Sequence, residues 1–121
     1  SRFAREDTKA GSELLLIGTN DSYFRDSLNP RQHNAHAVLR AVENGRCLVR
    51  SANTGISCTI MPTGRITKIS GVGTTEIITS EVYFRNKITP YTMAGDIVVI
   101  IAAAYIIFCA VYFNAILKRN N

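Results

Sequence analysis

The sequence predicts a layered α/β domain followed by a membrane helix. Helical and strand-like segments alternate over residues 1–96, and the strand-like runs are short and apolar. Residues 97–117, by contrast, read IVVIIAAAYIIFCAVYFNAIL and contain no charged side chain. At about 1.5 Å per residue, this run forms a helix of roughly 31 Å, which matches a hydrocarbon core of about 30 Å.

The predicted elements follow from local patterns. Residues 3–10 have helical composition, and residues 13–19 (ELLLIGT) are short enough for a buried strand. The clearest helix starts at Asn29-Pro30 and ends before Gly45. Its apolar residues at i, i+3, i+4 and i+7 predict one buried stripe. That stripe comprises Ala35, Val38, Leu39 and Val42.

The remaining strands are predicted from short apolar runs between turn residues. Cys47–Ala52 and Ile56–Met61 are the first two, separated by Asn53-Thr54-Gly55. Pro62-Thr63-Gly64-Arg65 is typical of a tight turn, which makes residues 66–69 a hairpin partner. Residues 76–82 predict a further strand before the segment that leads into the membrane helix.

Charge and composition exclude several classes of protein. A hydrophobic content of 46% with only 19% charged residues argues against disorder. The net charge of +5 is not gathered into a basic run with interleaved aromatics, so no nucleic acid partner is expected. Lys118 and Arg119 follow the apolar run and favour the cytoplasmic side. We therefore expect residues 118–121 to form a short cytoplasmic tail, with residues 1–96 outside.

The N-terminal residues are charged and lack the apolar core of a secretory signal peptide. We therefore expect Ser1 to be a truncation point.

Common catalytic and metal-binding patterns are weak in this sequence. His33 and His36 lie three residues apart on one predicted helix, but no third ligand follows a zinc signature, so we expect no metal. No serine lies in a G-x-S-x-G elbow. Cys47 and Cys58 are expected to be buried hydrophobes, with a disulfide as the alternative in an oxidising compartment.

Two polar loops follow predicted strands and are the candidate sites. Residues 20–24 (NDSYF) follow the first strand, and residues 53–55 (NTG) follow the second. Because α/β sheets place their sites at the carboxyl ends of strands, both loops are candidates for ligand contact.

Taken together, these segments resemble a known family. The order is N-D-x-[WY]-F, a helix with R-A-x-E, a strand running into N-T-G, then T-P-Y-x-x-x-G-D and an apolar run. This combination is similar to the C-terminal part of nitrilase-superfamily (carbon–nitrogen hydrolase) domains, and within them to the apolipoprotein N-acyltransferase family. The resemblance implies the C-terminal part of an α-β-β-α sandwich, followed by one transmembrane helix in the inner membrane of a bacterium.

The resemblance also implies an activity and its partners. A Glu–Lys–Cys triad takes a fatty acyl group from a membrane phospholipid as a cysteine thioester. The group then passes to the N-terminal lipidated cysteine of an apolipoprotein, and no cofactor is needed. All three triad residues lie upstream in the family. This chain should therefore hold no catalytic residue, be inactive alone and depend on the rest of the same polypeptide.

The resemblance further assigns the wall of the site. The expected substrate-binding residues are Asn20, Asp21, Tyr23, Phe24, Asn53, Thr54 and Gly55. Tyr23 stands where tryptophan is usual, and Arg25 where glycine is usual. Arg40 and Glu43 of the R-A-x-E motif are expected to form a structural pair. Two alternatives remain: a membrane-tethered nitrilase-like amidase, and a non-catalytic membrane-anchored interaction module.

Overall fold

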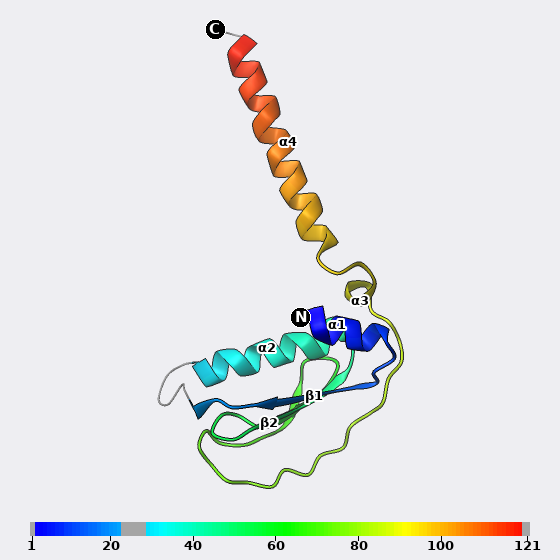
Figure 1. Ribbon diagram of the computed structural model, residues 1–121, viewed down its shortest axis with the longest axis vertical. Coiled ribbons are helices and arrows are strands. Elements are labelled where there is room, and N and C mark those ends of the chain that lie inside the picture. Colours follow the sequence, from blue (N-terminus) through cyan, green and yellow to red (C-terminus); the bar gives the residue numbers. More distant parts are fainter. Residues whose placement is uncertain (1, 23–28, 120–121) are drawn as a thin grey trace.

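The computed structural model describes residues 2–22 and 29–119 and confirms a mixed α/β fold (Figure 1). Its elements are α1 (Arg2–Lys9), β1 (Leu14–Thr19), α2 (Asn29–Asn44), β2 (Cys47–Ala52), β3 (Cys58–Ile60), β4 (Ile66–Ile69), α3 (Pro90–Ala94) and α4 (Ile97–Arg119). The four strands form one sheet in the order β1-β2-β3-β4. Strands β1 and β2 are parallel and joined through α2, whereas β2, β3 and β4 are antiparallel neighbours.

The core lies between the sheet and α2. Leu15, Leu48 and Ile60 line the helix-facing side of three adjacent strands, and all three are buried. Ala37 and Ala41 of α2 are buried in the same cluster. Alanine at both positions lets the helix backbone lie close to the sheet.

The predicted stripe on α2 is mostly wrong in its position around the helix, since Val38 alone of its four residues packs against the core. Leu39 and Val42 are 50% and 46% exposed, and Ala35 is exposed as well. The buried face instead carries Asn34, Ala37, Ala41 and Asn44. The periodicity favoured burial of the larger apolar residues. The two asparagines can be buried in their place because hydrogen bonds satisfy their side chains. Asn34 accepts a hydrogen bond from the Cys58 thiol, and Asn44 donates one to the Arg40 carbonyl.

The predicted strand at residues 76–82 is also wrong. The structure has no strand there, and the segment runs in an extended course along the side of the sheet away from α1 and α2 (Figure 1). Its contacts with the sheet are sparse: the Ser80 hydroxyl lies 3.4 Å from that of Thr67, and the Tyr83 N–H meets the Cys47 sulfur. Ile77 is 98% exposed. The alternating pattern thus predicted extended backbone correctly but not its pairing.

The T-P-Y-x-x-x-G-D motif docks the start of α4 onto the domain. The Thr89 hydroxyl caps α3 by accepting from the Thr92 N–H, and it donates to the Glu43 carbonyl at the end of α2. The Arg5 guanidinium of α1 donates to the Thr92 carbonyl at 3.0 Å. A Cβ at Gly95 would lie 2.7 Å from the Arg5 Nη1 atom, so glycine leaves room for this contact.

Helix α4 extends away from the sheet beyond α3 (Figure 1). Within the described part of the chain, no helix is long and apolar enough to cross a membrane.

Two smaller expectations concern side-chain pairs. Arg40 and Glu43 form the expected salt bridge on α2. Cys47 and Cys58 are both buried free thiols, so the disulfide alternative is wrong. Burial raises the pKa of the Cys58 thiol, which keeps it protonated and unreactive.

Residues 1–96 expressed alone should be poorly soluble. Strand β1 is an edge strand of apolar sequence, and Leu16 on its uncovered face is 73% exposed. Size-exclusion chromatography should show aggregates, and Leu16→Lys should raise the soluble fraction. A monodisperse wild-type monomer that melts cooperatively would contradict this prediction.

Candidate functional site

The loops after β1 and β2 meet at one edge of the sheet. Thr19 and Ala52, the last residues of the two parallel strands, are partners in the register. The Asn53 N–H donates to the Thr19 carbonyl at 3.4 Å, and the Asn53 Oδ1 accepts from the Asp21 N–H at 3.3 Å. The structure thus brings together the two candidate loops. Tyr23 and Phe24 lie outside the described residues.

Asp21 is the centre of this edge. Its carboxylate is buried, and the residue is only 2% exposed. Oδ2 accepts a hydrogen bond from Arg50 Nη2 at 2.7 Å. Oδ1 accepts one from the Thr19 hydroxyl at 3.0 Å and lies 3.2 Å from His33 Nδ1. The charge is therefore satisfied inside the protein by groups from β1, β2 and α2.

The electrostatics favour the ionised carboxylate. Burial alone would raise the pKa of Asp21, but three groups act against it. Hydrogen bonds from His33 and Thr19 and the positive charge of Arg50 together hold the pKa below its ordinary value. Asp21 is consequently a fixed anion at neutral pH.

Gly55 provides the space that Asp21 needs. A Cβ at this position would lie 2.0 Å from the Asp21 Oδ2 atom and 2.7 Å from its carboxyl carbon. The Gly55 backbone does not have a positive φ angle, so any residue could adopt its conformation. Lack of space, and not backbone strain, is the reason for glycine here.

The other predicted site residues face outward. Asn20, Asn53 and Thr54 are exposed, while Asp21 and Gly55 are buried behind them. The Asn20 Oδ1 accepts from the Ser22 N–H at 3.1 Å, and the Thr54 carbonyl accepts from the Gly73 N–H at 2.9 Å. Exposed amide and hydroxyl groups with anchored backbones can offer hydrogen bonds to a ligand.

Arg50 was not among the site residues predicted from the sequence. Its guanidinium is 3% exposed and contacts both loops. The signal was present, because an arginine inside the apolar run CLVRSA requires a buried acceptor, and Asp21 was the candidate carboxylate. A cavity of about 350 Å³ adjoins the pair, lined by Ile17, Thr19, His33, His36, Ala37, Arg40 and Arg50.

His33 lies against the Asp21 carboxylate. Among the residues described, no three histidine, cysteine, aspartate or glutamate side chains gather as a metal site would require. Of the two helix histidines, His33 contacts the buried carboxylate of Asp21 and so helps to stabilise its charge.

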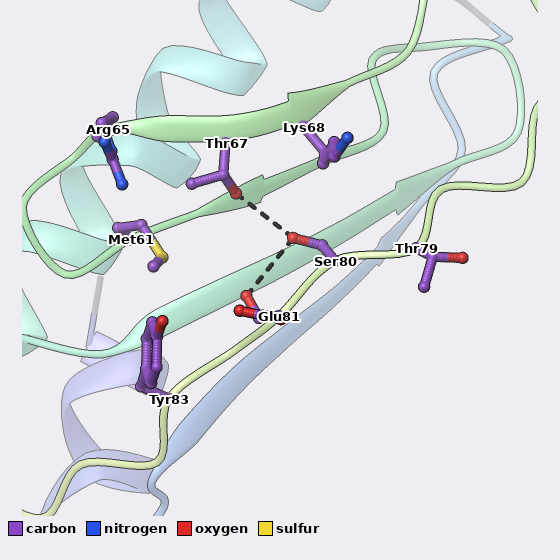
Figure 2. Close-up of a pocket in the computed structure, with 8 residues that line it drawn as sticks. All are labelled: Met61, Arg65, Thr67, Lys68, Thr79, Ser80, Glu81 and Tyr83. Carbon is purple, nitrogen blue, oxygen red and sulfur yellow. Dashed lines mark hydrogen bonds between the residues drawn. The ribbon is translucent and has the colours of Figure 1, made fainter.

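A second hollow lies away from these loops (Figure 2). It measures about 470 Å³ and lies between the β3–β4 hairpin and residues 79–83. The Thr67 and Ser80 hydroxyls meet across it at 3.4 Å. Its lining residues are Met61, Arg65, Thr67, Lys68, Thr79, Ser80, Glu81 and Tyr83. None of the predicted site residues belongs to this set, so it is not the candidate site.

Replacing Asp21 with asparagine should destabilise the domain strongly. Asp21→Asn leaves the buried Arg50 charge uncompensated, a loss of about 3–5 kcal/mol of unfolding free energy. Asp7→Asn, at an exposed position, should change it by less than about 0.5 kcal/mol. Thermal denaturation of the full-length protein in detergent measures both.

The effect of Asp21 should also depend on pH. Because the pKa of Asp21 is lower in the folded state, its stabilisation is complete above the unfolded pKa of about 3.9. It is lost as the pH falls through the lower folded pKa. The difference between wild type and Asp21→Asn should therefore be constant from neutral pH to about pH 5 and shrink below about pH 4. A constant difference down to about pH 2 would contradict this assignment.

Comparison with known proteins places the chain in a family. Residues 3–86 match the family described as carbon–nitrogen hydrolase. An apolipoprotein N-acyltransferase of Gloeobacter violaceus is 39% identical over 100 residues, covering 83% of this chain and 19% of that protein. Those of Wigglesworthia glossinidia brevipalpis and Thermosynechococcus vestitus are 36% and 40% identical, over 77% and 71% of this chain. The chain spans about a fifth of the length of these curated relatives. It belongs to the carbon–nitrogen hydrolase family.

Proposed function

We propose that the chain is the C-terminal part of an apolipoprotein N-acyltransferase. The observation that carries this proposal is the similarity to proteins of that name, at 35–40% identity over most of the chain. The matched region includes both loops of the candidate site. The acyl donor is a membrane phospholipid, and the acceptor is an apolipoprotein with a lipidated N-terminal cysteine.

The fold supports the presence of a further strand beside β1. Helix α1 leads into β1 and lies on the same side of the sheet as α2 (Figure 1). Since α2 joins two parallel strands, α1 is placed to follow another parallel strand through a right-handed crossover. That strand would pair with the free edge of β1 and end beside Asn20 and Asp21. We place the nucleophilic cysteine there, upstream of Ser1, with the glutamate and lysine earlier still.

The exposed side of the sheet supports a sandwich. Leu16 is 73% exposed and Val49 is half-buried on the side away from α1 and α2, where residues 76–83 cover the sheet only in part. A second sheet from the upstream polypeptide would bury this face, as the α-β-β-α arrangement requires.

The proposed reaction has two acyl-transfer steps. The cysteine thiolate attacks the ester carbonyl of the phospholipid, and the lysophospholipid leaves with the proton that the glutamate took from the thiol. The amine of the acceptor then attacks the thioester, forming an amide and releasing the cysteine thiol. The lysine stabilises the oxyanion in both steps. In this chain Asn20, Asn53 and Thr54 form the wall that contacts substrate, and Tyr23 and Phe24 are assigned to the same wall.

The membrane arrangement is part of the proposal. In the proposed arrangement, residues 97–117 cross the bacterial inner membrane, with residues 1–96 outside the cytoplasm and residues 118–121 within it. The uncharged run and the basic pair that follows it support this orientation.

Acyl transfer by the full-length protein tests the proposal. The polypeptide that includes the upstream segment should be reconstituted in phospholipid vesicles with a diacylglyceryl-cysteine peptide. Mass spectrometry should show a third acyl chain on the peptide amine and a hydroxylamine-sensitive acyl-enzyme. The 121-residue chain alone, as the control, should show neither product. Hydrolysis of simple amides without acylation of the peptide would favour a membrane-tethered amidase instead.

A further inference from the structure

We propose that Arg50 and Asp21 are positioning residues that hold the two substrate-contacting loops in one fixed arrangement. The assignment of the loops to substrate rests on the proposed acyl transfer. The coupling of the loops through this ion pair rests on geometry alone.

One guanidinium reaches both loops. Arg50 projects from β2 toward the α2 side of the sheet, opposite Ile17 in the register. Its Nη2 atom donates to Asp21 Oδ2 at 2.7 Å, in the loop after β1. Its Nη1 atom donates to the Ile56 carbonyl at 3.2 Å, directly after Gly55 in the loop after β2. Movement of either loop would break a hydrogen bond to a buried charge.

The carboxylate of Asp21 is occupied by contacts inside the protein, so neighbouring residues are the ones available to bind substrate. Its two carboxylate oxygens face Arg50, Thr19 and His33, and its backbone N–H binds the Asn53 side chain. The exposed groups at the same edge are those of Asn20, Asn53 and Thr54. Asp21 therefore acts on substrate through the loops that it holds, and not by contact.

Gly55 makes this idea testable without removing a charge. An alanine Cβ would lie 2.0 Å from Asp21 Oδ2, so Gly55→Ala must displace the carboxylate or the loop. Most of the effect should disappear when the carboxylate is absent, because the closest contact at 2.0 Å is then removed and only the Asp21 Cβ remains, at 2.9 Å. In an Asp21→Ala background, the methyl group at position 55 would take up much of the space left by the carboxylate, and a small shift would relieve its contact with the Asp21 Cβ. The two substitutions should therefore be strongly non-additive.

Gly18→Ala is the matched control. Gly18 lies on β1 near the same edge, and a Cβ there would meet nothing within 4 Å. The substitution adds the same methyl group at a strand position without touching Asp21, so any effect it has through the proposed second sheet should be independent of the carboxylate.

The kinetic experiment uses the full-length enzyme in vesicles with the lipopeptide acceptor. Gly55→Ala and Asp21→Ala should each lower kcat/KM for the acceptor by about 10- to 100-fold, mainly through a raised KM, in the protein that remains folded. The loss in the double variant should be far smaller than the product of the two single losses, whereas any loss in Gly18→Ala should combine multiplicatively with that of Asp21→Ala. Arg50→Lys, which keeps the charge, should recover part of the activity that Arg50→Met loses.

Hydrogen exchange tests the coupling independently of activity. In Asp21→Ala the amides of Asn53 and Gly73, which bind the Thr19 and Thr54 carbonyls, should exchange faster, while Gly18→Ala should leave them unchanged. Unchanged exchange would overturn the inference, as would multiplicative kinetic losses or normal KM and kcat in the folded fraction. Faster exchange in a protein without acyltransferase activity would sustain the coupling and reject the proposed function.

Discussion

The geometry of the candidate site depends on a buried ion pair between Arg50 and Asp21. Removing two charges from water is costly, and well-packed apolar side chains in the same space are often at least as stabilising. Apolar packing, however, does not fix the direction of a loop, whereas a charge with defined hydrogen-bond partners does. We therefore interpret the ion pair as fixing the positions of the two loops, although burying its charges costs some folding free energy.

A second buried arginine has a similar role at the other end of β2. Arg46 is 1% exposed and donates to the backbone carbonyls of Ser12 and Lys87. It ties the start of β1 and the segment before α3 to the sheet without using a carboxylate. Burial, with a smaller contribution from Arg85, lowers the pKa of Arg46, although an arginine remains charged. One anchoring arginine thus immediately precedes β2 and another lies within it, and they hold segments at opposite ends of the strand.

The sequence was informative where local chemistry decides structure. The Asn-Pro start and Gly45 end of α2, the strand at residues 47–52 and the meeting of the two loops were all predictable, because caps, turns and parallel strand ends follow local rules. The face of α2 was not predictable, since Asn34 and Asn44 are buried only because Cys58, Thr92 and the backbone satisfy them. The unpaired course of residues 76–82 and the partner of Arg50 likewise depend on tertiary contacts. The role of His33 could be interpreted only from the structure, which brings it against Asp21, a residue 12 positions away in sequence.

The position of the ion pair within the sheet explains why it is suited to the proposed reaction. Asp21 follows β1, the edge strand, so the loop it holds borders the space that the proposed upstream strand would fill. A nucleophile arriving on that strand must meet a wall that is already in place, because acyl transfer to an amine competes with hydrolysis whenever the thioester is loosely covered. A wall built from loops alone would be mobile. Anchoring both loops to a side chain from β2, with room for the Asp21 carboxylate left by Gly55, transfers the rigidity of the sheet to the residues proposed to contact substrate. The same anchoring also explains why the pair lies behind the wall, where water cannot compete for its hydrogen bonds.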